Sequence, residues 1–388
     1  MPKIYLDNAA AAPVAPEVQQ EVARAMKLTG NPSSFNDTGR AAAAELYKAR
    51  LAVARFLGAH TEEIIFTSSG SEANNLAING IAAAYGKKGS SIITTKIEHP
   101  SVLEPVKYLG RKGFKIIYAG NNKEGVVDTE DLKKNISGRT VLISVMYANN
   151  EIGTIEPVRE IGMLIRDFRK KRNSKLPLFH VDACQAAGYL NMNVNTLGAD
   201  LLSFNGSKIY GPRGVGVLYV RKGLKLEPMI RGGDQERGLR AGTENPPAIL
   251  GLAKAVSLIK KDESRKTAEL RDYFIEKINK VLPEARLNGP IGQGRLPNNV
   301  NISIPGLNSE NILLELDKHG ISAGSGSACT ARSVEPSHVL KAIEVEKKYL
   351  SGVLRFSMGR ETTKKDLDYV LKILPEAVAE LKKRYGKD

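Results

Sequence analysis

The sequence predicts an α/β protein with a large domain, built on a mostly parallel sheet covered by helices on both faces, and a smaller α+β C-terminal domain. Up to Val220, short apolar stretches alternate with amphipathic or alanine-rich stretches of helical period. Such alternation is typical of βαβ units. Near residues 232–247 it stops at a Gly- and Arg-rich segment, and mixed strands and helices follow. We therefore place the large domain at 15–257 and the small domain at 258–388, with 1–14 packed against the small domain.

Two helices, at 16–28 and 39–58, are expected before the first strand, with a turn-rich loop at 30–37 between them. The strands expected in the large sheet lie at 63–67, 91–96, 114–119, 140–147, 178–183, 200–204 and 215–220. The helices expected between them lie at 71–85, 101–111, 129–135 and 158–172. For the C-terminal part the pattern predicts one long helix at about 248–281, strands at 299–304 and 354–357, and helices at 309–318 and 365–385.

Composition and charge limit the classes of function. The 388 residues, 42% of them hydrophobic, can bury a sizeable core, and the formal net charge is +15. Basic clusters at 169–172 and 382–384 have no interleaved aromatic residues, which favours solvated helix faces over a nucleic-acid interface. The N-terminus lacks the pattern of a signal peptide, and no apolar run is long enough to span a membrane. The two cysteines form neither a disulfide framework nor a zinc motif. We expect a cytoplasmic protein without a metal site.

The stretch 200–220 contains the most informative residue, Lys208. It lies in a turn that begins at Asn205, between two apolar strand-like runs, which would hold the lysine better than a solvated helix face. Asp182 ends another buried-strand pattern, and Gln185 follows it. A strand-end aspartate and a fixed lysine suit pyridoxal 5′-phosphate (PLP): the lysine forms a Schiff base, and the carboxylate keeps the pyridine nitrogen protonated. The alternative is a surface lysine beside an unrelated aspartate.

Three further sites follow predicted strands. Gly70 and Ser71 stand where a helix begins, which suits either an anion such as a cofactor phosphate or an ordinary N-cap. Asn150 either shapes a turn or points its amide at a ligand. His99 is either structural or a ring that stacks on a flat cofactor or relays protons.

The C-terminal part contains a cysteine and an arginine with functional potential. Cys329 lies among Gly, Ser and Ala residues, with Arg332 nearby, and an adjacent cation favours the nucleophilic thiolate. Cys184 lies in an apolar run and is interpreted as a small core residue. Arg355 lies inside an apolar strand and needs an anionic partner, either an internal carboxylate or the carboxylate of an amino-acid substrate.

Ordered motifs extend over nearly the whole chain, among them YLDNAAAAP, FTSSGSEANNLAI, ANNEIGTIEP, HVDACQAAG, SKIYGPRGVGVLYVR, ERGLRAGTEN, SGSACT and LRFSMGRETT. With these motifs the chain resembles the cysteine desulfurases, the NifS/IscS-like group of class V PLP-dependent enzymes. The resemblance implies the aspartate-aminotransferase-like fold and a homodimer. It also implies conversion of L-cysteine to L-alanine with a persulfide on Cys329. The SGSACT segment resembles that of the longer-loop subgroup of the family, whose members commonly pass sulfur to iron–sulfur scaffold proteins. The sequence leaves open whether the acceptor is such a scaffold, another sulfur-acceptor protein or a thiolation route.

The resemblance also implies roles for individual residues. Lys208 would hold PLP, Asp182 would pair with the pyridine nitrogen, Gln185 would approach the phenolic oxygen and His99 would stack on the ring. Together with Cys329, the sulfur acceptor, Lys208 and His99 would be the catalytic residues.

Two groups of residues would complete the site. The cofactor phosphate would be bound by Gly70 and Ser71, joined by Thr243 from the other subunit. The substrate carboxylate would be received by Asn150 and Arg355.

Several positions depart from the family pattern. Asn205 and Ser207 replace the usual Ser and His before the PLP lysine, although both can still donate hydrogen bonds to the phosphate. Asn36 and Asp234 replace a common His and a common Gly, and the chain ends without the longer tail of many relatives. We therefore keep two alternatives open: a selenocysteine lyase or related β-lyase, and a degenerate non-catalytic partner protein.

Overall fold

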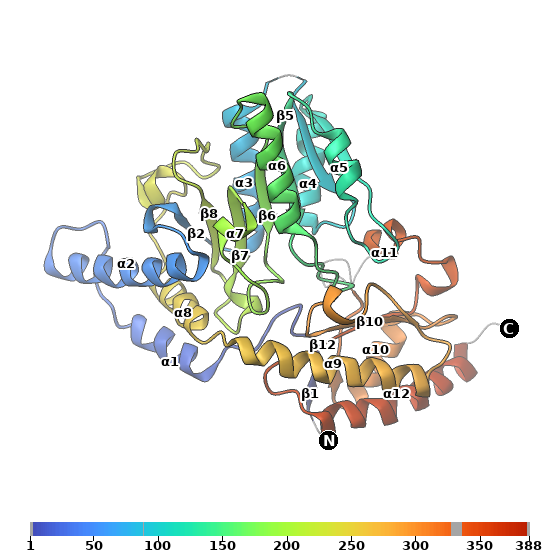
Figure 1. Cartoon of the computed structure of the whole chain (residues 1–388). Coiled ribbons are helices and arrows are strands. Elements are labelled where there is room, and N and C mark those ends of the chain that lie inside the picture. Colours follow the sequence, from blue (N-terminus) through green and yellow to red (C-terminus); the bar gives the residue numbers. More distant parts are fainter. Residues whose placement is uncertain (1–2, 88, 327–335, 386–388) are drawn as a thin grey trace.

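A computed structural model describes residues 3–87, 89–326 and 336–385, and its largest element is a seven-stranded sheet (Figure 1). The order is β2-β8-β7-β6-β5-β3-β4. The strands are β2 Ile64–Thr67, β3 Ser91–Thr95, β4 Lys115–Ala119, β5 Thr140–Met146, β6 Leu178–Asp182, β7 Leu201–Asn205 and β8 Gly216–Val220. Only the pairings of β8, with β7 and with β2, are antiparallel. The predicted mostly parallel sheet is confirmed.

Helices cover both faces of this sheet, because neighbouring apolar residues on each strand point to opposite sides. Ile92, Leu142 and Leu201 pack with α3 and α4 on one face. Ile93 and Ile143, one position further along their strands, face the second core under α2, α6 and α8. The helices of this part are α1 Pro16–Ala25, α2 Asp37–Leu57, α3 Gly70–Tyr85, α4 Pro100–Arg111, α5 Thr129–Asn135, α6 Val158–Arg172, α7 Val194–Leu197 and α8 Pro246–Ser257.

The C-terminal part has its own sheet and core. Its antiparallel sheet has the order β12-β10-β9, with β9 Arg286–Leu287, β10 Asn299–Ser303 and β12 Val353–Ser357. The helices are α9 Lys261–Val281, α10 Ser309–Lys318, α11 His338–Ala342 and α12 Lys364–Tyr385. Phe274 of α9 and Phe356 of β12 meet edge to face, with ring centroids 5.3 Å apart. Short 3₁₀ helices lie at Thr61–Glu63, Gly206–Lys208, Gln235–Gly238, Gly292–Gly294 and Lys347–Tyr349.

The N-terminal segment belongs to this C-terminal core. Strand β1, Ile4–Tyr5, pairs in parallel with β11, Ile321–Ser322. The side chains of Ile4 and Leu6 are buried among residues of α9, β10 and β12. The domain boundaries given above stay a prediction, but the two cores that they would separate are both present.

The single long helix expected at 248–281 is wrong. Helix α8 ends at Ser257 and α9 begins at Lys261, with Lys260 extended between them (φ −118°, ψ 132°). The two helices pack on different cores, since Ile249 belongs to the core of the large sheet and Phe274 to the C-terminal core. No Gly or Pro marks this break, so the requirement of tertiary packing overrides a sequence pattern that continues through it.

The described residues contain neither a membrane-spanning helix nor a metal-binding cluster. No helix within 3–87, 89–326 and 336–385 has both the length and the apolar character that a membrane span needs. In the same residues, no three His, Cys, Asp or Glu side chains are grouped so that they could hold a metal ion.

Candidate active site

A pocket of about 200 Å³ lies at the C-terminal ends of the central parallel strands, where ligands of such sheets bind. Met146, Asp182 and Asn205, the last residues of β5, β6 and β7, all line it. The remaining lining residues come from the segments that follow these strands, from helix N-termini, from the N-terminal segment and from the C-terminal sheet, and are Ala9, Ala10, Gly70, Ser71, His99, Ser101, Ala148, Asn150, Cys184, Gln185, Lys208 and Arg355. Most residues singled out from the sequence therefore meet in one place.

Lys208 enters the pocket from the short 3₁₀ helix that joins β7 to β8. Its Nζ donates hydrogen bonds to the carbonyl oxygens of Ala9, at 2.8 Å, and of Ala10. Gln185 also donates to Ala9, from Nε2 to the carbonyl oxygen at 3.0 Å. The N-terminal segment thus closes one side of the pocket and provides acceptors for the lysine.

Asp182 is nearly fully buried, and two donors fix the orientation of its carboxylate. Asn74 of α3 donates from Nδ2 to Oδ2 at 2.7 Å, and the backbone N–H of Cys184 donates to Oδ1 at 3.0 Å. Asn74 also donates to the hydroxyl of Ser101 at 2.9 Å. These bonds tie the carboxylate to the first turns of α3 and α4.

His99 precedes α4 and accepts the backbone N–H of Ser101 at its Nδ1 atom, at 3.1 Å. Burial lowers the pKa of the His99 ring below its usual value; the Asp182 carboxylate opposes this shift, and the Lys208 ammonium adds to it. The ring is therefore neutral near pH 7. A neutral imidazole is suited to stack on a flat ligand or to accept a proton.

Gly70 and Ser71 form the start of α3, with their backbone N–H groups among those that have no partner within the helix. The N-cap is Ser69, whose hydroxyl accepts the Glu72 N–H at 3.1 Å, so the alternative capping role of Ser71 is wrong. A Cβ atom at position 70 would lie 2.5 Å from the Cys184 sulfur and 3.0 Å from Asn205 Nδ2. The absent side chain keeps the helix N-terminus accessible to an anion in the pocket.

Two of the predicted phosphate-binding residues lie outside the lining. Ser207 donates from its hydroxyl to Asn205 Oδ1 at 3.3 Å and so acts on a residue that does line the pocket. Thr243 is exposed and does not line the pocket of its own chain. Both assignments, like the others in the site, stay predictions.

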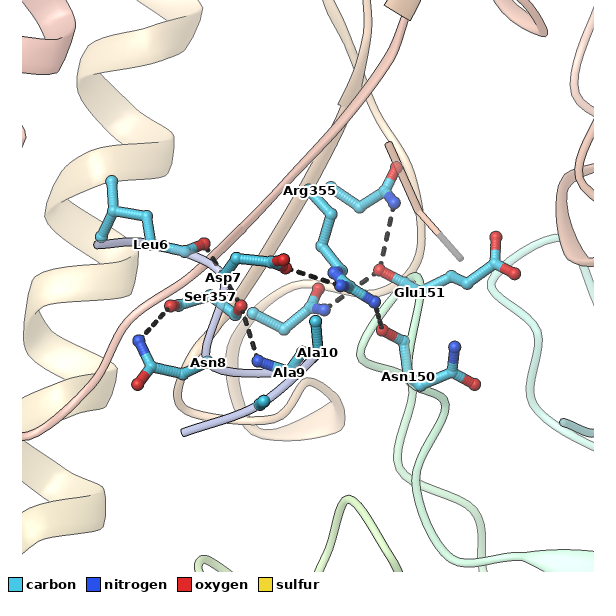
Figure 2. Close-up of polar contacts among 12 residues, drawn as sticks. Leu6, Asp7, Asn8, Ala9, Ala10, Asn150, Glu151, Arg355 and Ser357 are labelled. Carbon is cyan, nitrogen blue, oxygen red and sulfur yellow. Dashed lines mark hydrogen bonds and ion pairs between the residues drawn. The ribbon is translucent and has the colours of Figure 1, made fainter. Parts of the chain in front are cut away.

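Arg355 of β12 is 2% exposed and has two hydrogen-bond acceptors around its guanidinium (Figure 2). Nη2 forms an ion pair with Asp7 Oδ1 at 2.8 Å, and Nη1 donates to the backbone carbonyl of Asn150 at 2.9 Å. Nε is buried without a hydrogen-bond partner among the described residues. The internal carboxylate considered from the sequence therefore exists, and these two contacts use two of the five N–H groups of the guanidinium.

The two cysteines differ. Cys329 lies outside the described residues. Cys184, expected in the core, instead lines the pocket, because it follows Asp182 at the strand end rather than lying inside the strand. Burial raises the pKa of the Cys184 thiol well above its usual value, and the Asp182 charge raises it further. Cys184 is thus held as a thiol and is a poor nucleophile.

Three polar residues of this region were not singled out from the sequence. Asn74 supports Asp182, Asp7 pairs with Arg355, and buried Glu151 accepts the Ser337 hydroxyl at 2.6 Å. Each lies within a motif quoted above, but the sequence near it does not indicate its role. The partner of each is between 108 and 348 residues away in the chain.

A second cavity, of about 540 Å³, is larger. It is lined by the N-terminal segment, Tyr210, Leu258 and residues that include Arg360, which is already paired with Glu263 at 2.8 Å. Because it lacks a lysine beside a buried carboxylate and lies away from the ends of the parallel strands, we place the chemistry in the smaller pocket.

Comparison with known proteins assigns a family to this arrangement. The model of the family described as aminotransferase class-V matches residues 4–370. A relative from Dictyoglomus turgidum named cysteine desulfurase IscS is 46% identical over 98% of this chain and 95% of the relative. The solved structure of a NifS-like protein superposes with a TM-score of 0.90 at 35% identity, over 98% of this chain and 100% of the other. A structure described as SspA in complex with cysteine has a TM-score of 0.79 at 32% identity, over 92% and 99% of the two chains.

These similarities confirm two predictions from the sequence. The resemblance to the NifS/IscS-like group is matched by the named relatives and structures. The aspartate-aminotransferase-like fold class is matched by structural similarity over nearly the full length of the chain.

Proposed function

Because the chain belongs to the aminotransferase class-V family, we propose that it is a PLP-dependent cysteine desulfurase. The enzyme would convert L-cysteine to L-alanine and retain the sulfur as a persulfide on Cys329. The observation that carries this proposal is a single pocket that joins Lys208, the buried carboxylate of Asp182 and the guanidinium of Arg355. The names of the relatives, cysteine desulfurase, agree with the amino-acid chemistry of this pocket.

The residues of the pocket fit PLP. Lys208 would hold its aldehyde carbon, and Asp182, already oriented by Asn74, would hold the pyridine nitrogen protonated. The start of α3 offers backbone donors for the phosphate, and the missing side chain at Gly70 leaves the space for it. When bound, PLP supplies an electron sink for charge that develops at the α-carbon of the substrate.

Five more residues would complete the cofactor site. Asn205 and Ser207 would add donors near the phosphate, Gln185 would approach the phenolic oxygen, and His99, kept neutral by burial, would stack on the ring. Thr243 is exposed, which supports its proposed role at the cofactor phosphate of a partner subunit in a homodimer.

Arg355 would receive the substrate carboxylate. A planar guanidinium binds a carboxylate through two N–H groups, and a bidentate contact fixes the orientation of the amino acid as well as its position. The Asn150 carbonyl and the Asp7 carboxylate hold the guanidinium on two sides, so its plane is defined before the substrate arrives. Asn150 itself lines the pocket and would contact the same carboxylate.

The sulfur step would use Cys329 as the nucleophile. Its thiolate attacks the substrate sulfur, a sulfur–sulfur bond forms, and the carbon–sulfur bond of the substrate breaks. The electron pair of that bond stays on carbon, which takes up a proton and becomes the methyl group of alanine. Of the two cysteines in the chain, Cys184 is held as a thiol, which supports the assignment of this role to Cys329.

The persulfide would then pass to an iron–sulfur scaffold protein or another sulfur-acceptor protein. This part of the proposal, like the homodimer, rests on the resemblance of the motifs. The two widely separated cysteines support a reducing, cytoplasmic compartment.

The test is a product assay of the purified, PLP-loaded enzyme with L-cysteine. We expect alanine from the wild type and from Cys184→Ser, little alanine from Cys329→Ser, and none from Lys208→Ala. If Cys329→Ser makes alanine at nearly the wild-type rate, the protein is a lyase that does not need a cysteine nucleophile. If the wild type makes no alanine, the proposed function is wrong.

A further inference from the structure

We propose that Asp7 is a positioning residue for substrate recognition: it holds the Arg355 guanidinium in the plane that the substrate carboxylate requires. This inference rests on the proposed function, because it assumes that Arg355 binds that carboxylate. It adds the N-terminal segment to the residues that determine substrate affinity (Figure 2).

Asp7 is itself held in place by the backbone around it. On one side the Ser357 N–H donates to the Leu6 carbonyl at 2.6 Å. On the other side Asn8 donates from Nδ2 to the Ser357 carbonyl at 2.8 Å, and the Ala9 N–H donates to the Ser357 hydroxyl at 2.8 Å. Ser357 is two residues from Arg355 on the same strand, β12. The carboxylate and the guanidinium therefore start from backbones that are tied together, and their relative position is fixed.

Gly324 provides a second, independent observation. It pairs with Arg355 through both backbone hydrogen bonds, at 2.6 and 2.9 Å. A Cβ atom at Gly324 would lie 2.8 Å from Asp7 Oδ1 and 3.1 Å from Arg355 Nη2, which is too close for both atoms. Gly324 does not have a positive φ, so the steric requirement of the Asp7–Arg355 pair, rather than the backbone, accounts for a glycine here.

The ion pair between Asp7 and Arg355 uses only part of the N–H donors of the guanidinium. A guanidinium has five N–H groups. Asp7 and the Asn150 carbonyl each accept from one terminal nitrogen, and Nε has no partner among the residues that the structure describes. Without Asp7, the Asn150 carbonyl would be the one hydrogen-bond partner left to the guanidinium among the described residues, and a bidentate contact with a substrate tolerates little rotation of the plane.

The negative charge of Asp7 by itself would lower the affinity for the substrate, since the Asp7 carboxylate repels the substrate carboxylate. That repulsion is weakened by water, because the Asp7 side chain is 22% exposed whereas that of Arg355 is 2% exposed. Orientation is therefore expected to outweigh repulsion, and loss of Asp7 should weaken substrate binding.

The test compares Asp7→Ala, Asp7→Asn and Arg355→Lys in the PLP-loaded enzyme. Asp7→Ala should raise KM for L-cysteine about tenfold, with kcat within about threefold. Asp7→Asn keeps an oxygen acceptor and should restore most of the affinity. In the Arg355→Lys background, Asp7→Ala should add less than about twofold, because both changes act on one contact. Asp368→Asn, which removes a carboxylate paired with Lys364 on the surface, is the matched control and should behave as wild type.

A binding readout separates this role from a general loss of structure. In the Cys329→Ser background, titration of the cofactor absorption band should show weaker binding of L-cysteine in Asp7→Ala, with unchanged binding of cysteamine, which lacks the carboxylate. If Asp7→Ala does not fold, Gly324→Ala, which crowds the same pair, should give the same ligand-specific loss.

Three results would overturn the inference. They are unchanged or tighter binding of L-cysteine in the variant that is measured, an equal loss for cysteamine, or full additivity with Arg355→Lys. None of them bears on the proposed function, which is tested by alanine formation in the wild type and in Cys329→Ser.

Discussion

Gly70→Ala should weaken cofactor binding because the added methyl group would push the Cys184 sulfur into the pocket. The new Cβ would lie 2.5 Å from that sulfur, whereas carbon atoms in good contact are about 3.5–4.0 Å apart. The sulfur must therefore move by roughly 1 Å or more. Overpacking of this kind costs about 1–3 kcal/mol. Alanine is favoured over glycine in a helix by up to about 1 kcal/mol, which offsets part of this cost in the cofactor-free protein.

The displaced sulfur would crowd the cofactor as well, and an overpacking cost of about 1–3 kcal/mol in the bound state alone corresponds to a roughly five- to 150-fold increase in the Kd for PLP. The assay is titration of the cofactor-free protein with PLP, followed by the visible absorption band. Cys184→Ala removes the displaced atom, so the double variant should recover part of the affinity; the 3.0 Å contact with Asn205 Nδ2 limits the recovery. A Kd within twofold of wild type in Gly70→Ala, or no recovery in the double variant, would refute this reasoning.

Two other predictions follow from buried polar groups. Asn74→Ala removes a 2.7 Å hydrogen bond to the Asp182 carboxylate and should lower kcat for cysteine about tenfold or more. The control is Asn75→Ala, the neighbouring residue on α3, which should leave kcat nearly unchanged. Equal effects of the two substitutions would argue against a role for Asn74. Burial raises the pKa of Glu156 to about 8, so between pH 4.5 and 8 the folded state binds a proton that the unfolded state has lost. The free energy of unfolding should therefore fall as pH rises through this range, by at most about 1.4 kcal/mol per pH unit. Glu156→Gln should make this pH dependence less steep in denaturant titrations. An unchanged slope in the variant would contradict the assignment.

The fold was predictable because its signals are local. Each strand of the large sheet is a short apolar run, and pattern alone located these strands and the four longer helices between them to within a few residues, whereas the short helix α7 was not predicted. The break between α8 and α9 was missed because no local residue marks it. It exists only because Ile249 and Phe274 belong to different cores.

The site was predictable where a residue type has an unusual setting, such as Lys208 in a turn or Arg355 in an apolar strand. The residues that orient these side chains could not be found in the same way. Asp7 and Asn74 are ordinary residues in sequence, and they gain a role only when the fold brings them to partners far along the chain. The position of Cys184 was misjudged because an apolar setting in the sequence does not distinguish a core residue from one that lines a pocket.

The most direct test of the central claim is to locate the transferred sulfur. The PLP-loaded enzyme is treated with L-cysteine, alkylated under mild conditions and digested, and the peptides that contain Cys184 and Cys329 are examined by mass spectrometry. We predict one added sulfur atom on the Cys329 peptide and none on the Cys184 peptide, with alanine formed in equal amount during the first turnover. Alanine formation without added sulfur on Cys329, or sulfur found on Cys184, would contradict the account.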